Sequence, residues 1–401
     1  MRVVAAPYLL RGEGLPVPDG AVALDGDVVV AAGPREEIEA RHGPAERLDA
    51  VILPALVNAH LHLELSHLAG RVPGGQGLVP WIERLVAERQ RSADDPASAA
   101  GAMEAAAAGL ARAGVAAVGD VGNTLDALGP LGRHGLAGTL FHEVYGFSEE
   151  RARAAAEAAA GTRRRAGAPP AGLRVVPSPH AVYSTRPRLL AELLSAGPAS
   201  VHLAEDPAER AFCARMDGPF ADLARRLGAR DLRPLGRSAV ACAAPSLHAG
   251  ALAVHAVDLD GEDLEALRRS GATAVLCPRS NLHVGGRLAD LPRLLEAGVP
   301  LAVGTDSLAS SPSLSPLAEL AALHRAFPQV PAERLLPLAW AGASVGAPAV
   351  GRLSPGTAPG VLAAPLAGAR PADPFAWLLG FGAEERPLAW IARHRPEVSP
   401  A

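Results

Sequence analysis

Two histidines with one residue between them, His60 and His62, lie in the segment VNAHLHLELS. Alternate side chains of an extended strand point to the same side, so both imidazoles could bind one metal ion. A pair of solvated or hydrogen-bonded histidines is the alternative, which the pair alone leaves open. The segments VHLAE and VGTDS favour the metal site because they add the imidazole of His202 and the carboxylate of Asp306. Three His and one Asp suit zinc or ferrous iron and leave a position for water, as in many hydrolases.

These residues need a scaffold that brings distant segments together, and the hydrophobic pattern predicts one. From about Val51 onward, short apolar runs alternate with helix-like stretches at 79–91, 102–113, 149–165, 207–227, 262–270 and 288–297. Such alternation predicts a parallel sheet, and eight repeats predict closure into a (β/α)8 TIM barrel. The eight predicted strands are 51–62, 115–121, 137–144, 173–177, 200–205, 252–257, 274–278 and 300–306.

Polar residues stand at the ends of several predicted strands. His60 and His62 end the first strand, His202 and Glu205 the fifth, His255 the sixth and Asp306 the eighth. Catalytic groups of such barrels lie at the carboxyl ends of the strands. We therefore expect these side chains to meet at one rim.

The two ends of the chain have a different pattern from its middle. The first fifty residues contain short strands such as 21–24 and 28–32, separated by Gly, Pro and Asp, and the chain after Val350 is again rich in Gly and Pro. We expect residues 1–50 and 350–401 to form a small β-sandwich domain beside a barrel spanning residues 51–349.

Composition excludes several classes of function. A formal net charge of -4 with scattered arginines offers no basic surface for nucleic acid. The first residues lack a signal-peptide core and no 18-residue apolar run follows, so we expect a cytoplasmic protein that does not bind membranes. Cys213, Cys242 and Cys277 lack paired spacing and are expected to be buried thiols. The chain contains no lysine, which excludes Schiff-base chemistry, a P-loop and a metal pair bridged by a modified lysine.

The set of strand-end residues resembles that of the amidohydrolase superfamily, specifically its mononuclear-metal deaminase branch. The resemblance covers roughly residues 54–316. The absence of lysine agrees with one metal ion, since many two-metal relatives use a carboxylated lysine. The resemblance also implies a homodimer. It implies that one divalent ion, zinc or iron, is bound by His60, His62, His202 and Asp306.

The same resemblance assigns proton transfer to Glu205, His255 and Asp306. A ring carbon that carries an amino group is a poor electrophile until the adjacent ring nitrogen is protonated, and Glu205 suits that role. Asp306 can accept the proton of water while His255 holds its oxygen in line. Each has a structural alternative: Glu205 as the start of a helix, His255 as a buried histidine bonded to backbone, and Asp306 as the cap of a turn.

The segments HLHLELS, SPHAVYST, CPRSNLHVGG and GTDSLASSPSL are most similar to aminodeoxyfutalosine deaminases and to adenosine and S-adenosylhomocysteine deaminases. This resemblance implies loss of the 6-amino group of an adenine-type nucleoside, first of all aminodeoxyfutalosine, giving futalosine and ammonia on a route to menaquinone. The expected substrate-binding residues are His180, Glu64, for contact with a sugar hydroxyl, and Trp81, for packing on the base. Their alternatives are a hydrogen-bonded loop histidine, a support for a metal ligand and a core aromatic side chain.

A substrate carboxylate would need a cation, and Arg71, Arg186 and Arg279 stay open for it. Alternatives are a guanine, cytosine or chlorotriazine hydrolase on the same scaffold, or a catalytically silent assembly barrel. Silent relatives usually lose metal ligands, and none is missing here.

Overall fold

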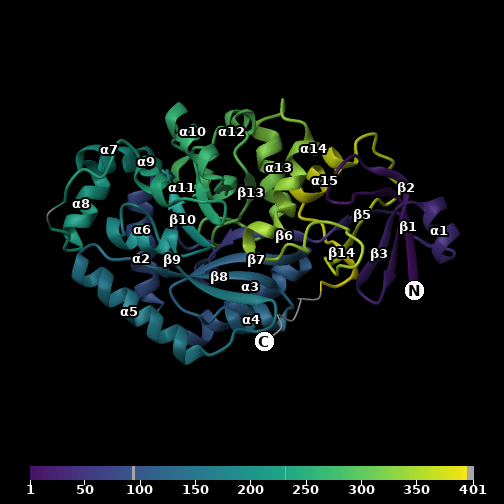
Figure 1. Ribbon diagram of the computed structural model, residues 1–401, viewed down its shortest axis with the longest axis horizontal. Helices are drawn as coiled ribbons and strands as arrows, with labels where there is room; N and C mark the ends of the chain where they lie inside the picture. Colours follow the sequence, from purple (N-terminus) through teal and green to yellow (C-terminus); the bar gives the residue numbers. More distant parts are fainter. Residues whose placement is uncertain (93–94, 231, 395–401) are drawn as a thin grey trace.

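The computed structural model describes residues 1–92, 95–230 and 232–394, and its largest part is a barrel of eight parallel strands (Figure 1). Nearly all residues of most of these strands are buried, as expected for parallel strands covered by helices. The strands are β6 (Leu56–Leu61), β7 (Val115–Gly122), β8 (Ala137–Val144), β9 (Leu173–Pro179), β10 (Ala199–Leu203), β11 (Ala251–His255), β12 (Thr273–Leu276) and β13 (Leu301–Val303).

The strands pair in two runs of four, β6 to β9 and β10 to β13, and two short bridges close the barrel. One bridge joins Leu61 to Asp306, where the amides of Thr305 and Asp306 donate to the carbonyl of His60 at 2.9 and 3.0 Å. The other joins Ala181 to His202. The predicted (β/α)8 barrel is confirmed.

Helices cover the outside of the barrel. Figure 1 shows α5 along its lower edge and α7 and α8 beyond the ends of the strands. The helices are α1 (Arg35–His42), α2 (Leu78–Arg91), α3 (Pro96–Arg112), α4 (Leu128–Arg133), α5 (Glu149–Ala166), α6 (Pro187–Ser195), α7 (Pro207–Arg215), α8 (Gly218–Arg226), α9 (Ala239–Ala243), α10 (Gly261–Ser270), α11 (Pro278–Gly285), α12 (Leu291–Ala297), α13 (Pro316–Ala326), α14 (Ala332–Leu335) and α15 (Pro374–Ala383). Short 3-10 helices are η1 (Leu63–Leu68), η2 (Ala244–Ser246), η3 (Leu336–Trp340) and η4 (Gly342–Val345).

The structure differs from the sequence prediction in one helix and one strand. The predicted helix 207–227 is two helices, because Met216 turns the chain in the left-handed region with φ 54° and Pro219 fits only the first turn of a new helix. The predicted strand 51–62 is also two, β5 (Ala50–Pro54) and β6. The amide of Ala55 bonds to Gly360 and that of Leu56 to Gly114, so the chain changes sheets between these residues.

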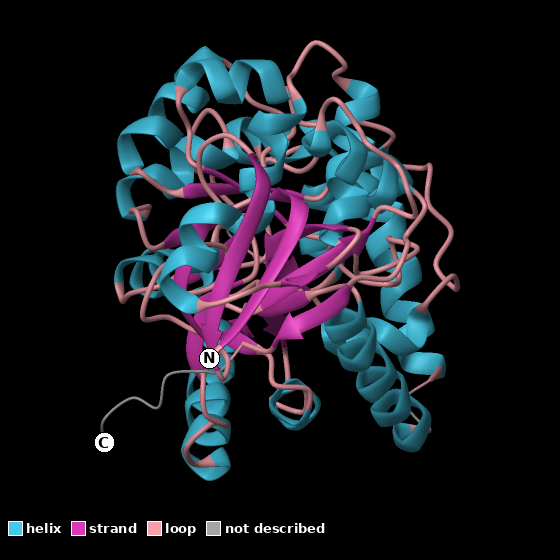
Figure 2. Cartoon of the chain, turned by 90° about the vertical axis from the view of Figure 1, so that its right-hand side faces the viewer, coloured by secondary structure: helices cyan, strands magenta, loops and turns pink. Residues whose placement is uncertain are grey.

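The second sheet contains strands from both ends of the described chain, in the order β15-β14-β5-β1-β2-β3, with β4 paired to β1. Figure 2 views the molecule from the side of this sheet. It forms the small β domain, while the domain boundaries at residues 50 and 350 stay predictions. Its further strands are β1 (Arg2–Leu9), β2 (Val17–Asp25), β3 (Val28–Pro34), β4 (Glu46–Arg47), β14 (Val361–Pro365) and β15 (Ala389–Ala392).

Two further expectations concern the cysteines and membrane-spanning helices. Cys213 and Cys277 are buried and Cys242 is half-buried, and all three are free thiols. Within the described ranges, no helix is both long and apolar enough to cross a lipid bilayer.

Candidate active site

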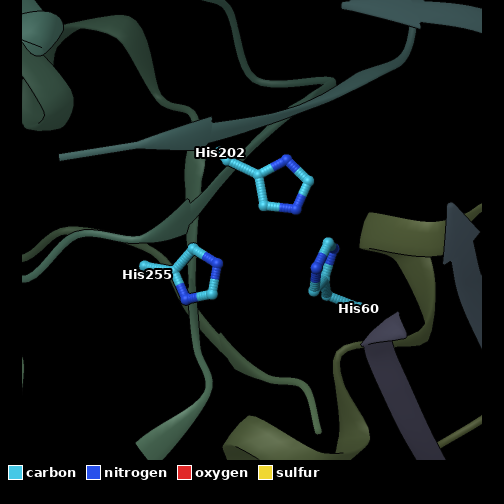
Figure 3. A group of neighbouring side chains, drawn as sticks. All are labelled: His60, His202 and His255. Carbon is cyan, nitrogen blue, oxygen red and sulfur yellow. The ribbon is translucent and has the colours of Figure 1, made fainter. Parts of the chain in front are cut away.

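The carboxyl ends of β6, β10 and β11 bring three buried imidazoles together. Figure 3 shows His60, His202 and His255 around a common space. Ring centroids lie 5.0 Å apart for His60 and His202, and 5.5 Å apart for His202 and His255. His62 and Asp306 complete the cluster, since ligand atoms of His60, His62 and Asp306 lie within 4.8 Å of one another. The structure thus brings together five side chains that the strand-end pattern selected.

The spacing of the ligand atoms fits a divalent metal ion. Nε2 of His62 lies 3.2 Å from Nε2 of His202 and 3.5 Å from Oδ1 of Asp306. Donors about 2.0–2.2 Å from a tetrahedral ion lie roughly 3.3 Å from each other. Both ring nitrogens of His60 are buried without a hydrogen-bond partner among the described residues, an arrangement that a bound ion would relieve.

The electrostatics keep the histidines neutral and the aspartate charged. Burial lowers the pKa of His62 and of His255 to about 3, and it also lowers the pKa of His60 and His202. Burial acts to raise the pKa of Asp306, but the neighbouring His62 and His255 outweigh it and the pKa lies below its ordinary value. Neutral imidazole and ionised carboxylate are the forms that bind metals.

Hydrogen bonds outside the cluster orient its members. Nδ1 of His202 donates to the carbonyl of His180 at 3.0 Å, which leaves the lone pair of Nε2 facing the cluster. Oγ of Ser280 donates to Oδ2 of Asp306 at 2.6 Å. Nδ2 of Asn281 donates to Nδ1 of His255 at 3.0 Å, so the ring proton of His255 is on Nε2. His255 is therefore set up to donate a hydrogen bond from Nε2 into the site.

Glu205 follows β10 and faces His255, with 3.4 Å between its Oε2 and Nε2 of the imidazole. Its side chain is only 8% exposed, and burial, followed by the charge of Asp306, raises its pKa well above the ordinary value. The helix-start alternative does not apply, because Asp206 is the N-cap of α7. Glu205 is thus a buried carboxyl group beside the cluster, in surroundings that favour its protonated form.

Backbone conformation at the rim is unusual for residues other than glycine. His255 has φ 78° and Asp306 has φ 57°, both in the left-handed region. Such conformations cost about 1–3 kcal/mol each and gather at functional sites. Asp306 also accepts a hydrogen bond from the amide of Ser307 at 2.8 Å. The side chain thus caps a turn, as the structural alternative expected, and faces the cluster as well.

Four members of the cluster, His62, His202, His255 and Asp306, line a cavity of about 860 Å³, a size suited to a small-molecule ligand. The expected substrate-binding residues His180, Glu64 and Trp81 all line it. Glu64 is already engaged: Arg89 donates to its Oε1 at 3.1 Å, and the amide of Asn123 donates to its Oε2 at 3.0 Å.

The three arginines singled out in the sequence are not among the residues that line this cavity. Arg279 pairs with Glu319 and Glu385, while Arg71 pairs with Glu88 and Arg186 with Glu149. The cavity is lined instead by Arg89 and Arg151.

Sequence reasoning also missed Glu143, the next-to-last residue of β8, whose side chain lines the cavity and is 8% exposed. Burial raises the pKa of its carboxyl group. Asp306 was selected because it is a polar residue at the end of a predicted strand. The predicted strand 137–144 ends in His-Glu-Val, so the same criterion also indicates Glu143.

A barrel whose rim carries a buried cluster of imidazoles and carboxylates is the architecture of a metal-dependent hydrolase. The chain belongs to the amidohydrolase family, whose model matches residues 51–343. It is 34% identical over 358 residues to the aminodeoxyfutalosine deaminase of Deinococcus radiodurans, covering 82% of this chain and 81% of the relative.

Two further comparisons agree with this assignment. A 5-methylthioadenosine/S-adenosylhomocysteine deaminase of Nitratidesulfovibrio vulgaris is 32% identical over 369 residues, 85% of this chain and 78% of the relative. The crystal structure of Helicobacter pylori aminofutalosine deaminase with methylthio-coformycin superposes with a TM-score of 0.83 at 22% identity, covering 97% of both chains. The last comparison supports the fold.

Proposed function

We propose that the protein is a metal-dependent aminohydrolase that removes the 6-amino group of an adenine-type nucleoside and releases ammonia. The observation that carries the proposal is the placement of the buried carboxyl group of Glu205 beside a cluster of potential metal ligands that lines a nucleoside-sized cavity. The 34% and 32% identical relatives, both named as deaminases of adenine-type nucleosides, support it.

The metal ligands in this proposal are His60, His62, His202 and Asp306, and the ion is zinc, with iron as the alternative. The orphaned nitrogens of His60 and the 3.2 Å separation of His62 and His202 support this set. When bound, the ion polarises a water molecule and lowers its pKa. His255 is left out of the ligand set because Asn281 leaves its Nε2 as a donor.

The side chains then divide the proton transfers. Glu205 gives its proton to the ring nitrogen next to the amino-bearing carbon, which makes that carbon electrophilic. The oxygen of water adds to the carbon while its proton passes to Asp306, and Nε2 of His255 holds the oxygen in line. The proton on Asp306 is passed to the amino group, which leaves as ammonia, and the ring keeps a carbonyl. Glu205 recovers its proton from the remaining oxygen-bound hydrogen.

The substrate that we favour is aminodeoxyfutalosine, which would give futalosine. Its carboxylate needs a cation, and Arg151 of α5 supports this choice. The guanidinium of Arg151 donates to the carbonyl of Leu227 and pairs with no carboxylate among the described residues. The second candidate is 5-methylthioadenosine or S-adenosylhomocysteine, supported by the apolar cavity wall that includes Leu65, Ile82 and Leu85. A homodimer, implied by the resemblance, and a cytoplasmic location, expected from the sequence, stay predictions.

The test is a substrate panel with purified, zinc-loaded protein. Ammonia release and the ultraviolet change on loss of the amino group are measured for aminodeoxyfutalosine, 5-methylthioadenosine, S-adenosylhomocysteine and adenosine, with guanine, cytosine and a chlorotriazine for comparison. We expect the highest kcat/KM for aminodeoxyfutalosine. Inertness towards every nucleoside with turnover of another ring would overturn the proposal, and inertness towards the whole panel would favour the silent barrel.

A further inference from the structure

Glu143 has one carboxylate oxygen in use and one free. Its Oε2 accepts from Nδ2 of Asn123 at 2.8 Å. Its Oε1 is buried and has no hydrogen-bond partner among the described residues. Nδ1 of His202 lies 3.9 Å from Oε1, too far for a hydrogen bond, and that nitrogen already donates to the carbonyl of His180. Glu143 lines the cavity, and its free oxygen is a buried acceptor that has no donor among the described residues.

The carboxylate is held in place by a chain of hydrogen bonds. Arg89 donates to Oδ1 of Asn123 at 3.0 Å and to Glu64 at 3.1 Å, while the amides of Asn123 and Thr124 donate to Oε2 of Glu64 at 3.0 and 3.1 Å. The side chain of Asn123 therefore cannot turn away from Glu143 without breaking the bond that its Oδ1 accepts from Arg89. A side chain fixed in this way is suited to recognise a ligand at little entropic cost.

The same contacts decide between the two carboxylates of the cavity. Both oxygens of Glu64 are occupied by protein donors, and the charge of Arg89 is paired with Glu64. Glu143 is the carboxylate with a buried, unused acceptor. The adenine base of a nucleoside donates hydrogen bonds through the amino group that leaves in the proposed reaction, whereas the sugar offers hydroxyl donors that remain available. A buried acceptor without a donor is unfavourable, so a ligand that supplies the donor is selected over one that lacks it.

We infer that Glu143 is the sugar-binding residue of this enzyme and accepts a hydrogen bond from a ribose hydroxyl through Oε1, which makes the site selective for ribonucleosides over deoxynucleosides. This inference rests on the proposed function and deepens it. It replaces one of the two sequence-based expectations for Glu64, the contact with a sugar hydroxyl. Glu64 does not contact the sugar in this assignment. It positions Arg89 and Asn123, and Asn123 in turn holds Glu143.

The test measures kcat/KM for adenosine, 2′-deoxyadenosine and 3′-deoxyadenosine with the zinc-loaded wild type and the Glu143→Gln variant. For the wild type we expect one of the two deoxynucleosides to be poorer than adenosine by roughly 10- to 100-fold, the cost of leaving a buried acceptor without a hydrogen bond. Glu143→Gln should lower the value for adenosine by a similar factor and leave that deoxynucleoside within about threefold, so that selectivity disappears.

Two controls make the result specific. Glu265→Gln changes the same residue type on the exposed face of α10, outside the cavity, and should leave all three values unchanged. Zinc content of Glu143→Gln, measured by mass spectrometry, should equal that of the wild type. If the amide of the introduced glutamine accepts the same hydrogen bond as the carboxylate, the comparison is repeated with Glu143→Ala.

The outcomes separate this inference from the proposed function. If the wild type deaminates nucleosides but Glu143→Gln lowers kcat/KM equally for all three, the carboxylate contacts the base or acts through His202, and the inference is overturned. Loss of zinc from the variant, or a wild type that does not discriminate between ribose and deoxyribose, overturns it as well. A wild type that releases no ammonia from any of the three nucleosides or from aminodeoxyfutalosine overturns the proposed function and, with it, the inference.

Discussion

Replacing Gly304 by alanine tests whether the junction of β6 and β13 sets the geometry of the site. A Cβ atom at position 304 would lie 2.8 Å from both Cβ and the carbonyl oxygen of His60 and 2.9 Å from its amide nitrogen. Ordinary van der Waals contact begins at 3.4 Å, and backbone atoms cannot rotate aside. The two chain segments must therefore separate by roughly half an ångström.

The separation has an energetic and a functional consequence. Overpacking of this kind costs about 1–3 kcal/mol of folding free energy. It also stretches the bonds from the amides of Thr305 and Asp306 to the carbonyl of His60, now 2.9 and 3.0 Å. Those bonds fix the 4.0 Å separation between Nε2 of His60 and Oδ1 of Asp306. We expect Gly304→Ala to weaken zinc binding by roughly 10- to 100-fold, as changes just outside a ligand set do.

The assay combines urea unfolding of the zinc-loaded and chelator-treated protein with a zinc titration. Gly101→Ala is the matched control: it adds the same methyl group inside α3, where nothing lies within 4 Å, and should stabilise the protein by about 0.5–1 kcal/mol. Wild-type zinc affinity and stability in Gly304→Ala would refute the reasoning, as would equal losses in both glycine variants.

Three further predictions concern the chemistry of the cavity. Glu205→Gln should lower kcat by roughly 10²- to 10⁴-fold while zinc content stays unchanged, measured by ammonia release and metal analysis; retained activity would contradict the proton-transfer role. The pKa of Glu205 in the folded protein is raised well above 4.5, and the mechanism needs its protonated form. We therefore expect kcat/KM to be highest at pH values below this pKa and to fall as the pH rises through it. Because the pKa of His255 is about 3, the plot of kcat/KM against pH should show no loss of activity on acidification near pH 6.5. A loss near pH 6.5 that is absent in His255→Gln would contradict this. Arg151→Gln should raise KM for aminodeoxyfutalosine by roughly tenfold but hardly change it for 5-methylthioadenosine, and equal effects on both would contradict a carboxylate contact.

The part of the site that follows from strand ends could be predicted from the sequence. In a parallel barrel every carboxyl end reaches the same rim, so residues as distant as His60 and Asp306 must approach each other once the strands are recognised. The period of two along a strand places His60 and His62 on one side for the same local reason. Glu143 obeys the rule less strictly, because the apolar Val144 follows it at the end of the predicted strand 137–144.

The contacts of each charged side chain could not be predicted, because they depend on how helices pack against the barrel. Glu64 meets Arg89 and Asn123, which lie 25 and 59 positions along the chain. Arg279 was a candidate for a substrate carboxylate, yet it is engaged by Glu319 and Glu385. Arg151 lines the cavity only because of the position of α5. The partners of these side chains do not recur at a regular spacing along the chain, so neither composition nor spacing predicts them.

The proposed ligands also lie where the barrel is held together by the fewest backbone pairs. The two four-stranded runs meet at isolated bridges, Leu61 with Asp306 and Ala181 with His202, and Asp306 and His202 are themselves proposed ligands. His60 and His62 come from the first run, while His202 and Asp306 belong to the second. Binding of one divalent ion to these four side chains would therefore link the two runs directly. Because an ion that binds only the folded chain adds to its stability, the proposed ligands would serve both the reaction and the closure of the barrel.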